Sequence, residues 1–480
     1  MVFRGCNFFS SYMLLSDVAR WCLTGIMLVF VTVNGAAQSL SLDAATDRVL
    51  SYSDALSAAK AGVDSQNHRA NSLDYLNYPR IGVEARVLES EKTLKVDLSD
   101  LKATASAILP LLNSTYGSVI ASEIPASKVF GTHISGVQSN VTATLPLYTG
   151  GRIDATQKVA KAGVRQAGAE LTLTEQTLRT QLAQIYFLYQ FSVRVRDVRI
   201  EVRDGLKLHL SNAIASEKAG VIAHSQTPQA RVAYDETERA LTQAESDMRS
   251  AGVALANILH LNAPPKTVTP LFVSSRPLPP VRGFIDAALE KHAQLARLGA
   301  VDDAAGEAVR IEGSDRLPQV YVFGKYNLAG RNRDLTTPDW AFGLGVRYDL
   351  FSGIDRTEAE EAAIQKQMQV RAQIRQTRND LETLVTRAYN DVGSAQSRFM
   401  LSESAITSAR ENVRVQEASF RSGYATSVDV VDARLALSRA EIDRAQAAYQ
   451  FDDALARLLS ACGEAETYSA YVDKADRIVQ

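Results

Sequence analysis

Cysteine, aromatic residues and excess charge are all scarce in this sequence. Its 480 residues include three cysteines, 7% aromatic residues, 52 basic side chains and 54 acidic ones. A chain so close to neutral lacks the basic surplus of nucleic-acid binders, so we expect no nucleic-acid partner. Cys6 and Cys22 lie in an N-terminal targeting segment, which leaves Cys462 as the one thiol of the mature chain and excludes a disulfide within it.

Motifs for catalysis and cofactor binding are also lacking. The segment Gly343-Leu344-Gly345 has neither the third glycine nor the following helix of a dinucleotide loop. None of the six histidines has the His-Glu-x-x-His spacing of zinc hydrolases; they are His68, His133, His209, His224, His260 and His292. We therefore expect no enzymatic activity, no cofactor and no metal site.

The N-terminus carries a targeting signal. Arg20 precedes the apolar run 21–33, and the small-residue stretch NGAAQS follows it. The run is too short to span a membrane and is typical of a secretory signal peptide, which we place at 1–37 with Met1 or Met13 as its start. A retained membrane anchor is the alternative, and the Gly and Ala that follow directly argue against it.

The mature sequence is an internal duplication, which has to be recognised before the fold is assigned. The proline pair Pro79 and Pro318 is 239 residues apart, whereas later landmarks are all 203 apart. The first copy therefore holds 36 additional residues, which we expect to form an enlarged loop around 88–130. The pairs at the constant separation are Gly150 with Gly353, Leu178 with Leu381, Tyr186 with Tyr389, and Gly220 with Gly423.

Each copy contains one very long helical segment. No proline interrupts 152–217 or 355–420, and about 65 residues at a rise of ~1.5 Å each make a rod on the order of 100 Å long. A rod of this length must lie against other long helices. Its apolar residues recur at the three- and four-residue spacing of a coiled coil, as at Leu171, Leu178, Leu182, Ile185 and Tyr189.

Strands with strict alternation precede the long helices. Residues 137–147 and 340–350 place apolar side chains on one face and small or polar ones on the other. Residues 81–87 form a third such strand, and 320–326 form a fourth, although Tyr321 and Phe323 blur its polarity. This alternation is what a transmembrane β-barrel needs, although a half-buried soluble sheet also alternates. Four strands in two hairpins cannot enclose a lumen, so copies from several subunits would have to close the sheet.

The transitions between strand, rod and turn recur in one order. Leu147-Tyr148-Thr149-Gly150-Gly151 and Leu350-Phe351-Ser352-Gly353 end a strand and open a long helix. The turns Ala219-Gly220-Val221 and Ser422-Gly423-Tyr424 follow 70 residues later. With these features the sequence resembles the TolC-like outer-membrane factor family, the outer membrane efflux proteins, over nearly all of the mature chain.

The resemblance implies an α+β membrane protein that forms a homotrimer in the outer membrane. Four strands per subunit would make a 12-stranded β-barrel continuous with a periplasmic α-helical barrel. It implies an exit duct for efflux or type I secretion, surrounded by outer-membrane lipid and working with a periplasmic adaptor (membrane fusion) protein and an inner-membrane pump or ABC transporter. The alternative is a periplasmic coiled-coil scaffold without channel activity. The exported cargo stays open between drug, metal and protein.

On this basis we divide the mature chain into two repeats, 38–262 and 283–463, joined by a linker at 263–282 and followed by a tail at 464–480. The first repeat is expected to contain a helix, a hairpin at about 79–148, the long helix 152–217, a tip turn at 219–226 and a helix at 227–262. The second is expected to contain a helix, a hairpin at about 318–351, the long helix 355–420, a tip turn at 422–427 and a helix at 428–462.

Two carboxylates at the second tip are candidates for a pore constriction. Asp429 and Asp432 are three residues apart and share one helix face. In a trimer they would form two stacked rings of three carboxylates, which favour cations and would gate the tunnel. The resemblance points to the same positions, six and nine residues after Gly423. A second interpretation, compatible with the first, is that Asp429 caps its helix in a box with Thr426.

The resemblance also assigns roles to the glycines and their neighbours. This sequence departs from the family pattern at two positions. It has Gln226 where family members frequently have an acid, and Ala425 where an arginine helps to lock some members shut. The charged lock between neighbouring tips is therefore in question. We expect His224 to be exposed and solvated, and a pH-sensitive contact is the alternative. The adaptor-contact residues are Gly220, Val221, Ser225, Gln226, Gly423, Tyr424 and Ala425, and the strand-to-helix junctions are Gly150, Gly151 and Gly353.

Overall fold

The computed structural model describes residues 39–112, 116–328 and 339–479. The expected signal peptide at 1–37, with either start, lies outside the described residues. Two long helices dominate the rest of the chain: α5 spans Arg152–Lys218 and α9 spans Arg356–Arg421. Among the helices described, none is both long and apolar enough to cross a membrane.

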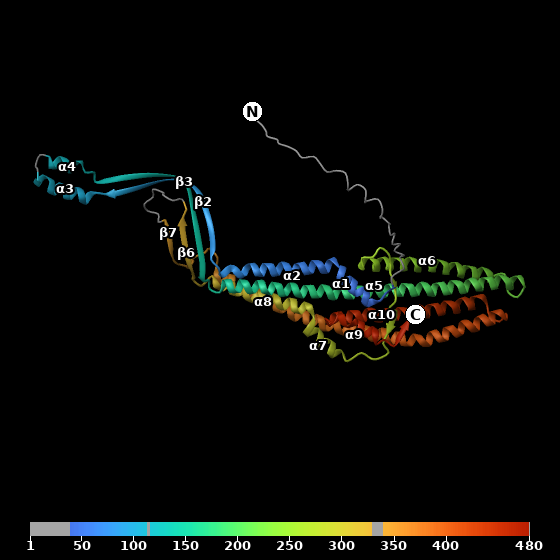
Figure 1. Cartoon of the computed structure of the whole chain (residues 1–480). Coiled ribbons are helices and arrows are strands. Elements are labelled where there is room, and N and C mark those ends of the chain that lie inside the picture. The colour runs from blue at the N-terminus through green and yellow to red at the C-terminus, as the bar shows by residue number, and fades with distance from the viewer. Residues whose placement is uncertain (1–38, 113–115, 329–338, 480) are drawn as a thin grey trace, which may run out of the picture.

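The long helices form one elongated body with two different neighbourhoods (Figure 1). Near the large sheet, α5 packs between α2 (Asp54–Leu73) and α8 (Ala293–Ser314), and α8 packs on α9. Toward the opposite end, the return helices α6 (Gln226–Ile258) and α10 (Ser427–Ala461) pack on the long ones. Because α5 and α9 run through both halves, each half contains four helices. These are α2, α5, α8 and α9 near the sheet, and α5, α6, α9 and α10 at the opposite end.

The helix expected over 227–262 ends earlier, at Ile258. His260 has a left-handed φ of 51°, and the Leu261 amide donates to the Ala256 carbonyl at 2.8 Å. These bonds close the helix in a turn before the linker. A single helix was expected before each hairpin, but the structure has two: α1 (Leu42–Tyr52) with α2, and α7 (Val281–Lys291) with α8.

Short strands and helices surround the middle of the body and extend the expected set of four strands. β1 (Ser39–Leu40) pairs in parallel with β4 (Lys266–Thr267), and β5 (Leu271–Val273) pairs antiparallel with β8 (Arg477–Val479). Strands of two or three residues are too short for an alternating pattern, which is why the sequence did not predict them. Three short helical segments complete this region: η1 (Asp74–Asn77), η2 (Ala465–Thr467) and α11 (Tyr468–Asp473).

The main apolar core lies at this middle level. The Tyr186 hydroxyl donates to the Leu40 carbonyl at 2.8 Å and accepts from the Thr269 amide at 3.0 Å. One buried phenol on α5 therefore fixes both the first strand and the linker between the repeats. The buried aromatic side chains of this core are Tyr186, Phe187, Phe272, Phe284, Phe399, Phe451 and Tyr468.

The large sheet is an antiparallel meander in the order β2-β3-β6-β7. Its strands are β2 (Arg80–Asp97), β3 (Ser127–Tyr148), β6 (Gln319–Asn327) and β7 (Trp340–Arg347). The register aligns Val83 with Val141, Val141 with Tyr326, and Tyr326 with Trp340, so apolar residues of all four strands share one face. That face is open in the monomer: Trp340, Phe342, Leu344 and Val346 are each about 70% exposed.

The aromatic rings that blurred the polarity of β6 have a structural explanation. Tyr321 pairs with Gly345 and Phe323 pairs with Gly343 on the opposite face of the sheet. A Cβ atom added at Gly345 would lie 2.5 Å from the Tyr321 ring, and one at Gly343 would lie 3.2 Å from the Phe323 ring. Both rings therefore lie over glycines of the neighbouring strand. Because glycine has no side chain, these positions leave room for the rings.

The prediction of an enlarged loop around 88–130 is wrong. β2 and β3 continue as a paired ribbon to Asp97 and Ser127, and the ribbon carries two helices, α3 (Ser99–Leu112) and α4 (Gly117–Glu123). The outer half of β2 contains Glu89, Glu91, Lys92 and Lys95, so its composition is typical of a loop. Backbone pairing with β3, whose nearest paired residue lies 30 positions further along the chain, overrides the local preference of these residues for a loop.

Candidate functional site at the helix tips

Both helix tips turn at a glycine with the same hydrogen bonds. Gly220 and Gly423 have left-handed φ values of 72° and 76°. The Val221 amide donates to the Ser216 carbonyl and the Tyr424 amide to the Ser419 carbonyl, both at 2.9 Å. This pattern is a Schellman motif, in which glycine avoids the strain that a Cβ atom causes at positive φ. The structure thus places equivalent turns at the ends of α5 and α9.

The second tip begins its return helix with a capping box. The Thr426 amide donates to Asp429 Oδ2 at 2.7 Å, and the Asp429 amide donates to Thr426 Oγ1 at 3.4 Å. The Thr426 hydroxyl also donates to Asp429 Oδ2 at 2.7 Å. These hydrogen bonds to the charged form hold the pKa of Asp429 below its ordinary value. The capping interpretation of Asp429 is confirmed.

Asp429 and Asp432 both remain exposed on α10. They lie within its first two turns, whereas the side chains between and after them, Val430, Val431 and Ala433, are buried against the body. The capping bonds occupy one carboxylate oxygen of Asp429 and fix its position. Two carboxylates therefore project from the same end of one rigid helix.

Gln226 joins the two tips directly. Its Oε1 accepts a hydrogen bond from the Ser427 amide at 3.0 Å, so the first residue of α6 contacts the first residue of α10. Ser427 is buried, and its hydroxyl lies 2.7 Å from Nε2 of His209 on α5. Gln226 thus links the two tips through a neutral hydrogen bond within one chain.

His209 sits in a buried environment between α5, α9 and α10. Its ring contacts Phe420 at a centroid distance of 4.7 Å. The charged side chains around it are Glu417 and Arg421 from α9 and Arg434 from α10, and Arg434 is paired with Glu417. Burial lowers the pKa of His209 to about 4, and the positive charge of Arg434 lowers it as well. The imidazole is therefore neutral at pH 7.

The remaining tip residues differ in exposure. Tyr424 is 91% exposed and Val221 is 58% exposed, so each turn presents an apolar side chain to solvent. Ala425 instead packs against a buried cluster that includes Phe420 and Val430. Ser225 precedes α6 without a side-chain capping bond.

His224 is exposed but has a partner. Its Nδ1 lies 2.5 Å from Glu217 Oε1, close to the start of the first turn. The nearby Thr227 hydroxyl and the His224 imidazole hold the pKa of Glu217 below its ordinary value. The expectation of a merely solvated histidine therefore needs correction, because the turn brings residue 224 back over the end of α5.

The strand-to-helix junctions also depend on positive φ. Gly150, Gly151 and Gly353 have φ values of 65°, 84° and 75°. At Gly150 a Cβ atom would lie 3.0 Å from both Leu317 Cβ and the Ser314 carbonyl oxygen, so the end of α8 packs directly on this backbone. Arg152 reinforces the contact with an ion pair to Asp315 at 2.9 Å.

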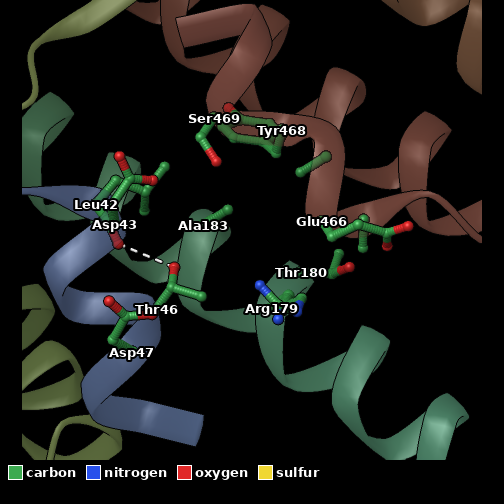
Figure 2. A pocket seen from close by; sticks show the side chains of 12 residues that line it. Leu42, Asp43, Thr46, Asp47, Arg179, Thr180, Ala183, Glu466, Tyr468 and Ser469 are labelled. Atoms are coloured by element: carbon green, nitrogen blue, oxygen red, sulfur yellow. Dashed lines mark hydrogen bonds between the residues drawn. The ribbon is translucent and has the colours of Figure 1, made fainter.

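A pocket of about 260 Å³ lies at the middle level, far from the tips (Figure 2). Asp43, Asp47 and Glu466 face it together with Arg179, which is itself paired with Glu175 at 2.7 Å. The Thr46 hydroxyl on its wall donates to the Leu42 carbonyl at 2.9 Å. Within the described parts of the chain, no cluster of three or more His, Cys, Asp or Glu side chains could hold a metal ion.

Comparisons with known proteins agree on one architecture. The family model described as outer membrane efflux protein matches residues 45–259 and 284–464, one segment in each half of the chain. The outer membrane protein TolC of Vibrio cholerae is 24% identical over 379 residues, which cover 75% of this chain and 83% of that protein.

Solved structures with little sequence identity have the same fold. CusC superposes with a TM-score of 0.71 at 14% identity, covering 88% of this chain and 91% of its own. The outer membrane protein VceC of Vibrio cholerae superposes with a TM-score of 0.68 at 16% identity, covering 88% and 96%.

Proposed function

This chain belongs to the outer membrane efflux protein family, and we propose that it forms the exit duct of a tripartite efflux or type I secretion system. It is a TolC-like protein of the outer membrane, with its helices on the periplasmic side. Members of the family are channels. As part of the proposal we retain the two repeats at 38–262 and 283–463 and the signal peptide at 1–37.

The open apolar face of the sheet carries the proposal. The four strands leave two open edges, at β2 and β7, and apolar side chains from all four strands share one exposed face. Open edges are not tolerated in lipid, because their backbone groups lack hydrogen-bond partners. Joining β2 of one copy to β7 of the next in a homotrimer closes a 12-stranded barrel with the apolar face toward outer-membrane lipid.

The helical body continues the duct into the periplasm. Three copies of α5 and α9, with their neighbours, would surround a tunnel that ends at the tips. There, a periplasmic adaptor and an inner-membrane pump or ABC transporter would engage the turns. The exposed side chains of Val221 and Tyr424 support such a contact, together with the neighbouring positions Gly220, Ser225, Gln226, Gly423 and Ala425.

We assign the constriction of the duct to Asp429 and Asp432. Three copies of each residue would form two carboxylate rings at the tip end, and such rings select cations. The capping bonds of Asp429 support this role, because they fix the carboxylate relative to the helix. A rigid ring narrows a pore more effectively than a mobile one.

Conductance of the purified mature protein in planar bilayers tests the proposal, after light scattering has established its oligomeric state. We expect a trimer with a small, cation-selective conductance, which increases and loses selectivity in the double variant Asp429→Asn/Asp432→Asn. Asp235→Asn/Glu236→Gln on α6 removes the same number of charges from exposed positions and serves as the control. A folded trimer that never conducts, even with both substitutions, would favour the scaffold without channel activity.

A further inference from the structure

The β2–β3 ribbon extends well beyond the rest of the sheet. Residues 88–97 pair with 127–136, and within the described residues these outer halves pair only with each other. About ten residue pairs at ~3.3 Å each give a length of roughly 33 Å. Figure 1 shows the ribbon continuing past the ends of β6 and β7 and carrying α3 and α4 at its far end.

The helices at the end of the ribbon expose apolar side chains. Leu101, Ile108 and Leu111 follow one face of α3 at helical spacing, and Leu111 is 84% exposed. Val119 and Ile120 on α4 are both more than half exposed. We call these five residues the ribbon-tip patch. From 101 to 122 the sequence contains a single charged residue, Lys102.

An apolar surface at the end of a thin ribbon requires a partner. An isolated two-stranded ribbon is marginally stable in water, and exposed apolar patches mark interaction sites. Lipid does not fit this position. At the tilt of about 40° that barrel strands have, the nine residues of β6 span roughly 23 Å, close to the ~25 Å apolar band of a membrane barrel. The ribbon begins where β6 and β7 end.

We propose that the ribbon-tip patch packs against the same patch of the two other copies, beyond the outer mouth of the barrel. This inference rests on the proposed trimer. β2 is the edge strand at which neighbouring copies would join, and the ribbon is the direct continuation of β2. Three ribbons rising from one ring are held at an effective concentration on the order of mM. With one charge in 22 residues, little repulsion opposes their contact.

Cysteine cross-linking in the full-length trimer tests the contact. Cys462, the one native thiol of the mature chain, is buried, and burial raises its pKa to about 12, so it does not compete. Leu111→Cys and Ile108→Cys place thiols in the ribbon-tip patch. Ser106→Cys places a thiol at another exposed position, on the opposite side of α3, and is the matched control.

Mild oxidation should convert Leu111→Cys and Ile108→Cys largely to disulfide-linked dimers, roughly tenfold more than Ser106→Cys at equal protein concentration. Equal cross-linking of all three variants, or none in either patch variant, would overturn the inference. An environment-sensitive label at residue 111 that is quenched by brominated lipid would also overturn it in favour of a membrane contact. Light scattering beforehand separates these outcomes from a failure of the trimer itself.

Discussion

Nε2 of His209 lies 2.7 Å from the hydroxyl of Ser427, and this buried contact joins the first long helix to the return helix of the second repeat. The same serine donates its amide to Gln226. Ser427, a neutral residue of the second repeat, therefore links the two tips of the chain by hydrogen bonds to His209 and Gln226 of the first repeat. Any opening that separates the tips must first break these two hydrogen bonds.

Acidification should weaken this contact. The folded-state pKa of His209 is about 4, below the value of 6.5 for a free histidine. The unfolded state therefore binds a proton first as the pH falls, so stability is lost between pH 6.5 and about pH 4. A shift of this size corresponds to roughly 3 kcal/mol. Thermal unfolding of the wild type should show a falling midpoint over this window, and His209→Gln should reduce the slope. An unchanged slope in the variant would assign the pH dependence to other groups.

Gly345→Ala should destabilise the sheet. The new Cβ atom would lie 2.5 Å from the Tyr321 ring, and overpacking of this kind costs about 1–3 kcal/mol. Assembly into trimers after refolding in detergent gives the measurement. Gly324→Ala in β6 meets open space and is the control. The double variant Tyr321→Ser/Gly345→Ala should recover assembly, and its failure to do so would contradict the ring clash.

Replacing two glycines of the same helix pair by alanine should change the free energy of unfolding in opposite directions. At Gly423 the backbone φ is 76°, so Gly423→Ala forces a side chain into the left-handed region at a cost of about 1–2 kcal/mol. At Gly393, inside α9, no atom lies within 4 Å of a new Cβ, so Gly393→Ala should stabilise by up to about 1 kcal/mol. Chemical denaturation of both variants checks the signs. Two shifts in the same direction would refute this account of the tip turn.

Thr426→Ala should distinguish the contribution of the helix cap to stability from the contribution of the Asp429 charge to ion selectivity. It removes the hydroxyl that caps α10, at a cost of about 1 kcal/mol. It also removes a hydrogen bond that lowers the pKa of Asp429, so that pKa should rise toward its ordinary value. Conductance measured against pH should then lose its cation selectivity at a higher pH than in the wild type. Thr426→Ser retains the hydroxyl and should behave as the wild type does.

The sequence predicts the features that depend on periodicity and repetition. The rods 152–217 and 355–420 were visible because one apolar spacing continues for many turns, and the structure has α5 and α9 there. The contact between His209 and Ser427 was not visible, because 218 residues separate the two and no spacing in the sequence links them. The ribbon was missed because its charged residues are typical of loops and its stability comes from cross-strand pairing.

The linker between the repeats receives both ends of the described chain. Ser39 aligns with Lys266 and Val479 aligns with Leu271, so the two ends pair with positions only five residues apart. A short peptide could therefore connect Val479 to Ser39, while new termini are opened after β5. Such a circular permutant would keep the registers of β1 with β4 and of β5 with β8 while presenting the repeats in reverse order. The strand pairing at the middle of the body therefore does not require the first repeat to precede the second in the chain.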